Sequence, residues 1–344
     1  MKIKKLLLVL VLLLVFVLVG CSDGPEPSDA PITSSEDEVY TIVFGNSGSD
    51  QVAHYNGIVA MKEYVEKESD GKLKMEIYMN SQLGNDRELI ESVQTGAVGM
   101  TVTGLTQFTN FVQELVALDQ PFLFDNTEQV IAFFNNTDVQ KELEGYFEAA
   151  SLKYLGSHFQ GFRTLTSNRR VVTPEDVKGM SIRVIESPTP LAIWNALGAS
   201  PTPISFAEVY TSLQQGVVEA QENPIELINS QRFYEQQKYI IDTNHQIQPN
   251  FWVVNPDFYN NLPAALQKIF DEGFEKTLEI SNRDTLAQTE EYINIIKGFG
   301  CELINITDDS RAKFKELTAG VRQDVSEQYP EFSKVINEVL DRIK

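Results

Sequence analysis

The sequence contains little cysteine and little histidine, and both shortages limit its chemistry. Two of the 344 residues are cysteine and three are histidine. Cys21 follows an N-terminal apolar run, which leaves Cys301 without an internal partner, so a disulfide framework is excluded. We expect Cys301 to be a buried structural thiol. The histidines are far apart in the sequence and no metal-binding spacing is present, so we expect no metal and no cofactor.

Positive charge is also scarce. Lysine and arginine number 28 against 49 aspartate and glutamate residues, for a formal net charge of −21. Nucleic-acid binding needs basic patches, so the composition argues against a nucleic-acid partner. The net charge would also repel an anionic ligand, but screening at physiological salt limits that repulsion to about 8 Å. A local cationic pocket can therefore still hold an anion.

The common catalytic motifs are missing as well. The sequence has no Gly-x-Ser-x-Gly motif, no Walker loop, no His-Glu-x-x-His motif and no EF-hand loop. We therefore expect a binding protein and not an enzyme. A lipoprotein enzyme that acts on an organic acid is the alternative, and turnover of a bound ligand would favour it.

One long apolar run is present, over residues 6–19, after Lys2, Lys4 and Lys5. It is too short for a comfortable membrane span and is typical of a signal peptide. The residues before Cys21 resemble a bacterial lipobox, which implies cleavage there, lipidation of Cys21 and an extracytoplasmic protein anchored to the cell membrane. We interpret residues 1–20 as the signal peptide and residues 21–38, rich in Ser, Asp, Glu and Pro, as a lipidated tether. A plain signal peptide or a short core helix is the alternative.

Hydrophobic periodicity predicts an α/β fold. The early chain alternates strands and helices, which favours parallel pairing, with ligands at the carboxyl ends of the strands. The expected elements are a strand at 40–44, a helix at 52–68, a strand at 72–79, a helix from a capping box at Asn85 and Glu88 to Gly96, and a strand at 98–103.

The later chain predicts a second unit of the same kind. We expect two helices over 127–150, an extended crossing stretch at 151–166, a strand at 180–184, a helix at 190–197, an extended stretch at 200–204, a helix capped by Ser205 with Glu208, a second crossing at 239–254, a long helix at 263–297, a strand at 301–306 and two final helices.

Two arginines in the middle of the chain carry the sharpest functional signal. Arg163 and Arg183 each lie among apolar or small residues in a strand-like segment, and Asn223 follows a third such segment. A guanidinium at a strand end can bind a carboxylate through two parallel hydrogen bonds. The alternative is that these arginines pair with structural carboxylates. Phe206, Asp86, Glu186 and Trp194 are equally ambiguous from chemistry alone.

Several longer motifs resemble one family. From about residue 40 onward, the chain is similar to the solute-binding subunit of tripartite ATP-independent periplasmic (TRAP) transporters, a family that includes dicarboxylate and sialic acid binders. The motifs are Gly-Lys-Leu at 71–73 and the segments at 81–87, 161–169, 178–184, 198–204, 206–216 and 221–224.

The resemblance implies a two-lobed, periplasmic-binding-protein-like α/β fold with a cleft between the domains, crossing strands and a long hinge-spanning helix. It implies lobe I at 39–160 plus 249–288 and lobe II at 161–248 plus 289–344. It also implies that Arg183 clamps the substrate carboxylate, assisted by Arg163. Asn223 and Phe206 would complete the site, and Asp86 would add a polar contact.

The chain departs from the sialic acid binders. Gly104 and Gln107 stand where those proteins carry a glutamate and an arginine, and Glu186 replaces an asparagine. The resemblance therefore favours a smaller acid, a sugar acid or a dicarboxylate. His54, Thr103 and Glu186 are the candidates for contacting its far end.

The predicted function is capture of a small organic acid and its delivery to TRAP permease subunits in the membrane, by a monomer that performs no chemistry on the substrate. A C4-dicarboxylate binder, or a sensing lipoprotein that feeds a membrane receptor, is the alternative.

Overall fold

The structure is a computed structural model that describes residues 38–343. The signal peptide, the lipidation site at Cys21 and nearly all of the tether lie outside these residues, so those predictions are not tested by it. Within the described residues, no helix combines the length and the apolar composition that crossing a membrane requires.

The described strands form two sheets, and the first has five strands. Their spatial order is β2 (Leu73–Tyr78), β1 (Tyr40–Gly45), β3 (Met100–Gly104), β10 (Ile247–Val254) and β4 (Lys153–Phe162). β1 pairs parallel with β2 and β3, whereas β10 is antiparallel to both β3 and β4. Helices α1 (Ala53–Glu68) and α2 (Asp86–Thr95) connect the parallel strands. The strand–helix alternation predicted for this region is confirmed.

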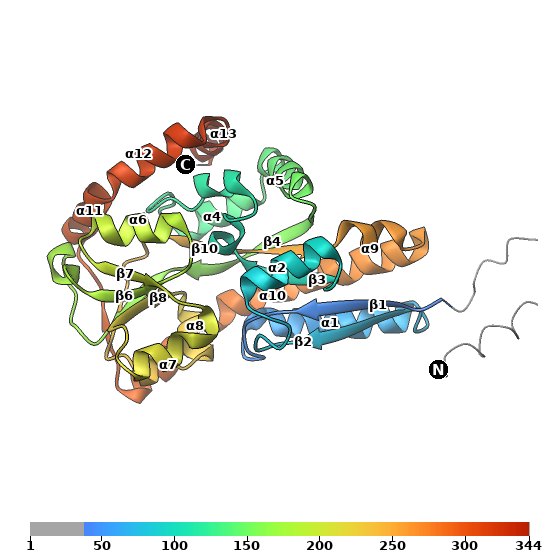
Figure 1. Cartoon of the computed structure of the whole chain (residues 1–344), viewed down its shortest axis with the longest axis horizontal. Coiled ribbons are helices and arrows are strands. Elements are labelled where there is room, and N and C mark those ends of the chain that lie inside the picture. The colour runs from blue at the N-terminus through green and yellow to red at the C-terminus, as the bar shows by residue number, and fades with distance from the viewer. Residues whose placement is uncertain (1–37, 344) are drawn as a thin grey trace, which may run out of the picture. The chain divides into compact units, whose positions relative to one another are not determined.

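The second sheet has six strands. Their order is β11 (Glu302–Ile304), β9 (Tyr239–Ile241), β5 (Thr164–Ser167), β8 (Ala220–Asn223), β6 (Ser181–Val184) and β7 (Ser200–Pro203). β6 is parallel to β7 and β8, and α6 (Pro188–Ala196) joins β6 to β7. Figure 1 shows β6, β7 and β8 at the left and β1 and β2 of the first sheet at the right.

Two segments pass from one sheet to the other. β4 belongs to the first sheet and β5 to the second, so the predicted extended stretch at 151–166 is two strands with Arg163 between them. The predicted crossing at 239–254 likewise divides into β9 and β10. The crossings bring the ends of strands from both sheets together, which is where the resemblance places the ligand.

The remaining helices of the described residues are α3 (Leu105–Phe108), η1 (Gln113–Ala117), α4 (Thr127–Phe134), α5 (Thr137–Ala149), η2 (Pro174–Val177), η3 (Phe206–Glu208), α7 (Val209–Gln214), α8 (Ile225–Ser230), η4 (Phe233–Glu235), α9 (Pro256–Asn261), α10 (Ala264–Phe299), α11 (Asp308–Leu317), α12 (Ala319–Gln328) and α13 (Pro330–Arg342), where η denotes a 3₁₀ helix. Figure 1 shows α4, α5 and the helices from α7 to α13 arranged around the sheets.

Two predictions about helix boundaries were wrong. Three helices follow β11, and not two, because a new helix, α13, begins at Pro330. Proline suits the first turn of a helix because its φ is fixed near the helical value and its missing N–H would have no partner within the helix. The capping box predicted at Ser205 does not form: the Ser205 side chain makes no capping bond, and the 3₁₀ turn η3 comes before α7. In contrast, the box of Asn85 and Glu88 is complete at the start of α2.

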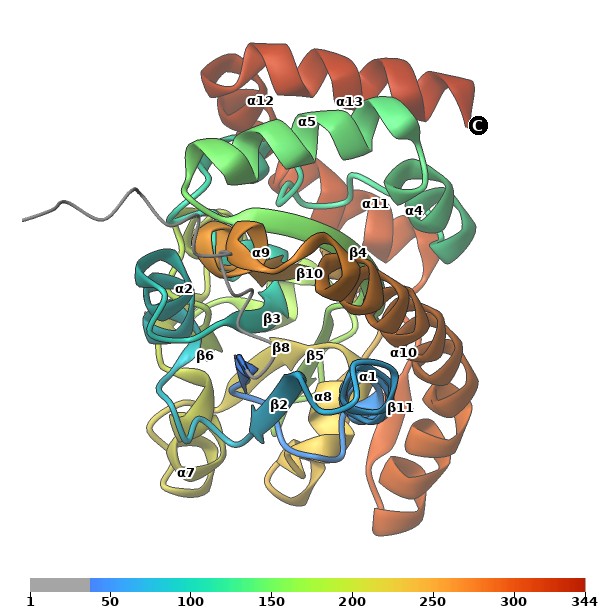
Figure 2. The same ribbon diagram turned by 90° about the vertical axis from the view of Figure 1, so that its right-hand side faces the viewer.

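The long helix α10 packs along α1, as Figure 2 shows. The two helices come close at Gly57 of α1. A Cβ atom at that position would lie 2.7 Å from the carbonyl oxygen of Thr277 and 2.8 Å from Oγ of Ser281. The backbone oxygen cannot move aside without shifting α10, so the helix contact depends on the missing side chain.

We expect Gly57→Ala to destabilise the protein by about 1–3 kcal/mol, because overpacking outweighs the better helix propensity of alanine. Gly145→Ala is the matched control, since a Cβ at Gly145 of α5 meets no atom within 4 Å. That change should stabilise the protein by about 0.5–1 kcal/mol. Urea unfolding of both variants measures the difference, and equal effects of the two substitutions would contradict the packing argument.

Candidate functional site

Side chains attached to both sheets line one polar cavity. The space between its lining atoms is about 460 Å³, part of which is open solvent. Of the eight ligand-contact residues predicted from the sequence, the cavity brings seven together: Arg183, Arg163, Asn223, Phe206, Asp86, His54 and Thr103. The eighth, Glu186, is exposed and lines an adjoining pocket that shares Asp86, Arg183 and Phe206 with the cavity.

Arg183, on β6, is a buried cation without a protein carboxylate bound to it. Its side chain is 1% exposed, and its Nε donates to the carbonyl oxygen of Ile204 at 2.9 Å. Its Nη1 has no hydrogen-bond partner anywhere in the described chain. Burial, and then the charge of Arg163, lower the pKa of Arg183 to about 10, so the group remains charged at neutral pH. A buried charged donor that lacks a partner is costly, and a bound anion would supply the partner.

Arg163 lies in the same cavity wall, but its guanidinium is held by protein acceptors. Nε and Nη2 bind the two carboxylate oxygens of Glu222, and Nη2 also donates to the side-chain oxygen of Asn223 at 3.2 Å. Nη1 donates to Gln248. The sequence left open the alternative that Arg163 and Arg183 pair with structural carboxylates. Arg163 does so, whereas Arg183 keeps a hydrogen-bond donor free.

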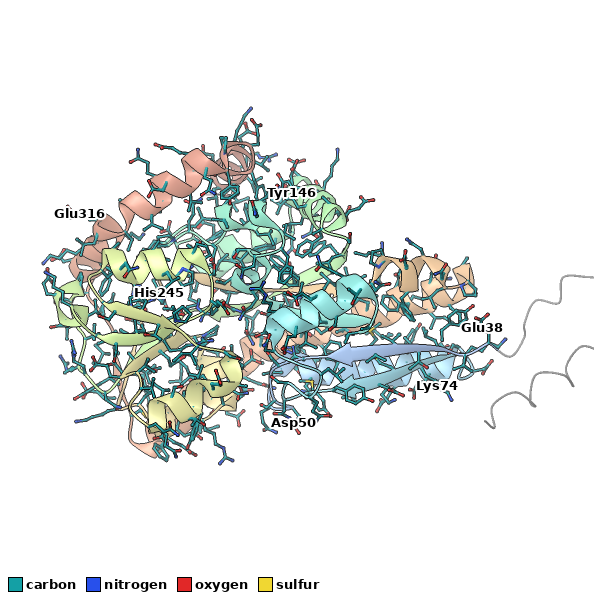
Figure 3. The ribbon with its side chains drawn as sticks, viewed as in Figure 1. Glu38, Asp50, Lys74, Tyr146, His245 and Glu316 are labelled. Atoms are coloured by element: carbon teal, nitrogen blue, oxygen red, sulfur yellow. The ribbon has the colours of Figure 1, made fainter. Side chains whose placement is uncertain are left out.

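Glu222, on β8, is fully buried between Arg163 and His245. Nε2 of His245 lies 3.2 Å from the carboxylate, and Figure 3 labels this histidine beside the second sheet. Burial by itself would raise the pKa of Glu222. The charge of Arg163, its hydrogen bonds and the nearby His245 outweigh burial and lower the pKa to about 2. Glu222 is therefore ionised and balances the charge of Arg163.

Asp86 brings a carboxylate to the cavity from the first turn of α2. Its Oδ1 accepts hydrogen bonds from Ser47 at 2.7 Å and from Thr103 at 2.8 Å. Gln107 donates to Oδ2 at 3.3 Å. Burial raises the pKa of Asp86, against the hydrogen bonds that lower it. The carboxylate is an acceptor at the cavity wall and would repel a second anion placed beside it.

His54 provides a neutral polar surface. It is 4% exposed, and neither ring nitrogen has a hydrogen-bond partner among residues 38–343. Burial lowers the pKa of His54 to about 3, so the imidazole is uncharged at neutral pH. The ring lies 5.4 Å from that of His158 and 5.8 Å from that of Trp252, measured between centroids. A neutral imidazole in this place can donate one hydrogen bond to a ligand and accept one.

Asn223 and Phe206 complete the predicted set. Asn223 ends β8, and its side-chain nitrogen donates to Gln221. Phe206 begins η3, is half-buried and packs edge-to-face on Phe233 at 6.0 Å. Both residues line the cavity, Asn223 from the end of β8 and Phe206 from the segment after β7, and both strands belong to the second sheet.

The sequence analysis missed Glu222, Gln248 and Asn250. Gln248 and Asn250 also line the cavity from β10, and Glu222 lies behind it. A sequence signal exists for Gln248 and Asn250: Gln246, Gln248 and Asn250 recur with a period of two, which predicts a polar strand face. A polar strand face indicates a binding site only where it is buried. Gln248 and Asn250 are buried because β10 pairs with β3 on one side and β4 on the other.

As predicted, Cys301 is a buried free thiol. Its sulfur lies 3.2 Å from the carbonyl oxygen of Gln237. Within residues 38–343, no group of three or more histidine, cysteine, aspartate or glutamate side chains is arranged to hold a metal ion.

Comparisons with known proteins show the family of this chain. The family described as bacterial extracellular solute-binding protein, family 7 (DctP) matches residues 44–328. A solute-binding protein of Verminephrobacter eiseniae is 31% identical over 77% of this chain and 78% of its own. The C4-dicarboxylate-binding periplasmic protein DctP of Rhodobacter capsulatus is 30% identical over 79% of this chain and 82% of its own.

A solved structure shares the fold as well. It is a TRAP periplasmic solute-binding protein of Desulfovibrio salexigens with bound orotic acid, with 28% identity and a TM-score of 0.83. The match covers 89% of this chain and 100% of that one.

These matches define an extracytoplasmic solute-binding protein with a two-lobed α/β fold. The chain belongs to the bacterial extracellular solute-binding protein family 7, the DctP family of TRAP solute-binding proteins. Because this is a family of transport proteins, the prediction that the chain is not an enzyme is confirmed.

We expect Glu222→Gln to destabilise the protein by about 3–5 kcal/mol, because it leaves the charge of Arg163 buried and unpaired. Denaturant unfolding at neutral pH measures this effect. Glu91→Gln is the control: Glu91 pairs with Arg87 on the surface, and removing its charge should cost less than about 1 kcal/mol. A similar small cost at Glu222 would show that the buried pair does not support the fold.

Proposed function

We propose that the protein captures a small organic acid by placing its carboxylate against the guanidinium of Arg183. The free Nη1 donor of this buried arginine is the observation that carries the proposal. Arg163 is held by Glu222, which balances its charge, so its contribution is the positioning of Asn223 and not a second clamp. Asn223 and Phe206 would contact the acid from the second-sheet side.

The chemistry of the cavity favours a hydroxylated monocarboxylate such as a sugar acid. Besides Arg183, the cavity wall offers the Asp86 carboxylate and the neutral His54, which suit hydroxyl groups. A second ligand carboxylate near Asp86 would meet like charge. A dicarboxylate is the alternative ligand, because the similar DctP protein of Rhodobacter capsulatus is a C4-dicarboxylate-binding protein. Glu186, in the adjoining pocket, would contact the far end only of a longer acid.

Binding would be coupled to closure of two lobes, with lobe I at 39–160 plus 249–288 and lobe II at 161–248 plus 289–344. Arg183 is 1% exposed, so an acid can reach it only if the cavity walls separate first. The closed form would then dock on the membrane subunits of a TRAP permease and release the acid to them. The ligand favours closure only by its extra affinity for the closed form. The protein would act as a monomer without a cofactor.

A thermal-shift panel of acids tests the proposal. Galactonate, erythronate, glucuronate, succinate and orotate at neutral pH would cover sugar acids, a dicarboxylate and an aromatic acid. We expect at least one sugar acid to raise the melting temperature and the matching uncharged sugar alcohol to have no effect. The proposal fails if the uncharged analogue stabilises the protein as well as the acid does.

We expect Arg183→Ala to weaken binding of the best acid by about 2–5 kcal/mol, or about 30-fold to several thousand-fold, measured by calorimetry. Arg183→Lys should also weaken binding, because an ammonium cannot form the planar pair of hydrogen bonds. Arg170→Ala is the matched control, since Arg170 is exposed and lies outside the cavity. Unchanged affinity in Arg183→Ala would remove this residue from the site.

We also propose that a lipid on Cys21 anchors the protein to the outer face of a membrane. The support is the lipobox-like sequence before Cys21. Expressed in a bacterium, the natural chain should fractionate with membranes, and Cys21→Ser should release it. Membrane association that survives this substitution would contradict the anchor.

A further inference from the structure

Glu226 is a buried carboxyl group that the proposed acid-binding site does not use. It lies in the first turn of α8, three residues after Asn223, and its side chain is 4% exposed. Its Oε2 has no hydrogen-bond partner in the described part of the chain. A buried carboxylate without a full set of partners is unusual, so its position calls for a physical explanation.

The other oxygen of Glu226 binds an element of the first sheet. Oε1 accepts a hydrogen bond from the backbone N–H of Ala53, the first residue of α1. The N-cap residue of α1, Val52, makes no side-chain capping bond, so Glu226 supplies an acceptor that the start of this helix otherwise lacks. The bond joins α8, which directly follows the second-sheet strand β8, to the helix that follows β1.

This bond lies immediately behind the wall of the acid-binding cavity. Val52 and His54, on either side of Ala53, line the cavity, and so does Leu227, the residue after Glu226. Separation of the elements of the two sheets, which a ligand needs in order to reach Arg183, would pull α8 away from α1. Opening would therefore break the Glu226–Ala53 bond and expose the carboxyl group to water.

We propose that Glu226 is a proton-linked positioning residue that holds α8 against α1 in the closed protein, so that the protein binds its acid more tightly as the pH falls. The inference rests on the proposed function, since it concerns the affinity of the same cavity. The inference adds a pH dependence of the ligand affinity, which the cavity residues by themselves do not imply.

The direction of the effect follows from burial. Burial raises the pKa of Glu226 to about 7, against the Ala53 hydrogen bond that lowers it. In an open form the carboxyl group meets water and its pKa returns toward the ordinary value of about 4.3. At a pH between these two pKa values, closure is therefore accompanied by uptake of a proton. The contribution of protonated Glu226 to the stability of the closed form is complete at a pH below the lower pKa. It is lost as the pH rises through about 7.

The histidines and the tyrosine near Glu226 do not titrate in the same window. On α1, burial lowers the pKa of His54 to about 3, and on β4 burial lowers that of His158 well below its usual value. On α10, burial and then the Glu226 charge raise the pKa of Tyr292 to about 12. Asp86, across the cavity, also has a raised pKa, so the effect of Glu226 has to be measured as a difference between two proteins.

Glu226→Gln isolates this effect, because glutamine keeps the side-chain oxygen that accepts from Ala53 and cannot ionise. The affinity of the natural chain and of the variant for the acid with the largest thermal shift in the panel above is measured by calorimetry from about pH 5.5 to about pH 8. We expect tighter binding by the variant than by the natural chain, with the smaller difference at the acidic end of the range and the larger difference at the basic end. The ratio of the two affinities should rise by at least about tenfold across the range.

The outcomes separate this inference from the proposed function. An affinity ratio that stays constant with pH, or a variant that binds more weakly at every pH, overturns the role of Glu226 and leaves the acid-binding proposal intact. Failure of every acid in the panel to bind overturns both. Glu290→Gln, which removes an exposed carboxylate from α10, is the control for net charge and should leave the ratio constant.

Discussion

The site depends on a guanidinium that is buried without a bound carboxylate. Arg183 is removed from water by the packing of β6, and its Nη1 donor has no partner in the described chain. A protein pays a substantial desolvation cost for such a group unless something pairs with it. The arrangement is therefore best suited to a state in which an anion occupies the cavity, and the surrounding polar groups decide which anion fits.

The neighbouring arginine shows why similar sequence surroundings need not mean similar roles. Arg163 and Arg183 look alike in the sequence, but Glu222 binds one of them through two hydrogen bonds and leaves the other free. The ion pair of Arg163 and Glu222, with His245 beside it, stabilises the place where β4 passes into β5. The ion pair of Arg163 and Glu222 thus lies next to Arg183, the proposed carboxylate-binding residue, and the net charge of this pair is close to zero.

Much of the fold could be predicted because local patterns decide it. The capping box of Asn85 and Glu88 formed as its spacing indicates, and the strand–helix alternation from residue 40 led to parallel pairing. The misses are also local in origin. Ser205 has the right spacing to Glu208 for a capping box, but a 3₁₀ turn occupies the position, and Pro330 divides one expected helix into two. Competing turn chemistry is hard to judge from spacing alone.

The sequence by itself determined the α/β class, the family, the early strand–helix alternation and part of the candidate site, since each depends on periodicity, capping or a motif of neighbouring residues. Only the tertiary structure decided which arginine is free and which is paired. It alone brought Glu226 to the start of α1 and His54 to the ring of His158. These contacts join residues more than a hundred positions apart, and burial, which sets their charge states, is a property of the packed chain and not of any short segment.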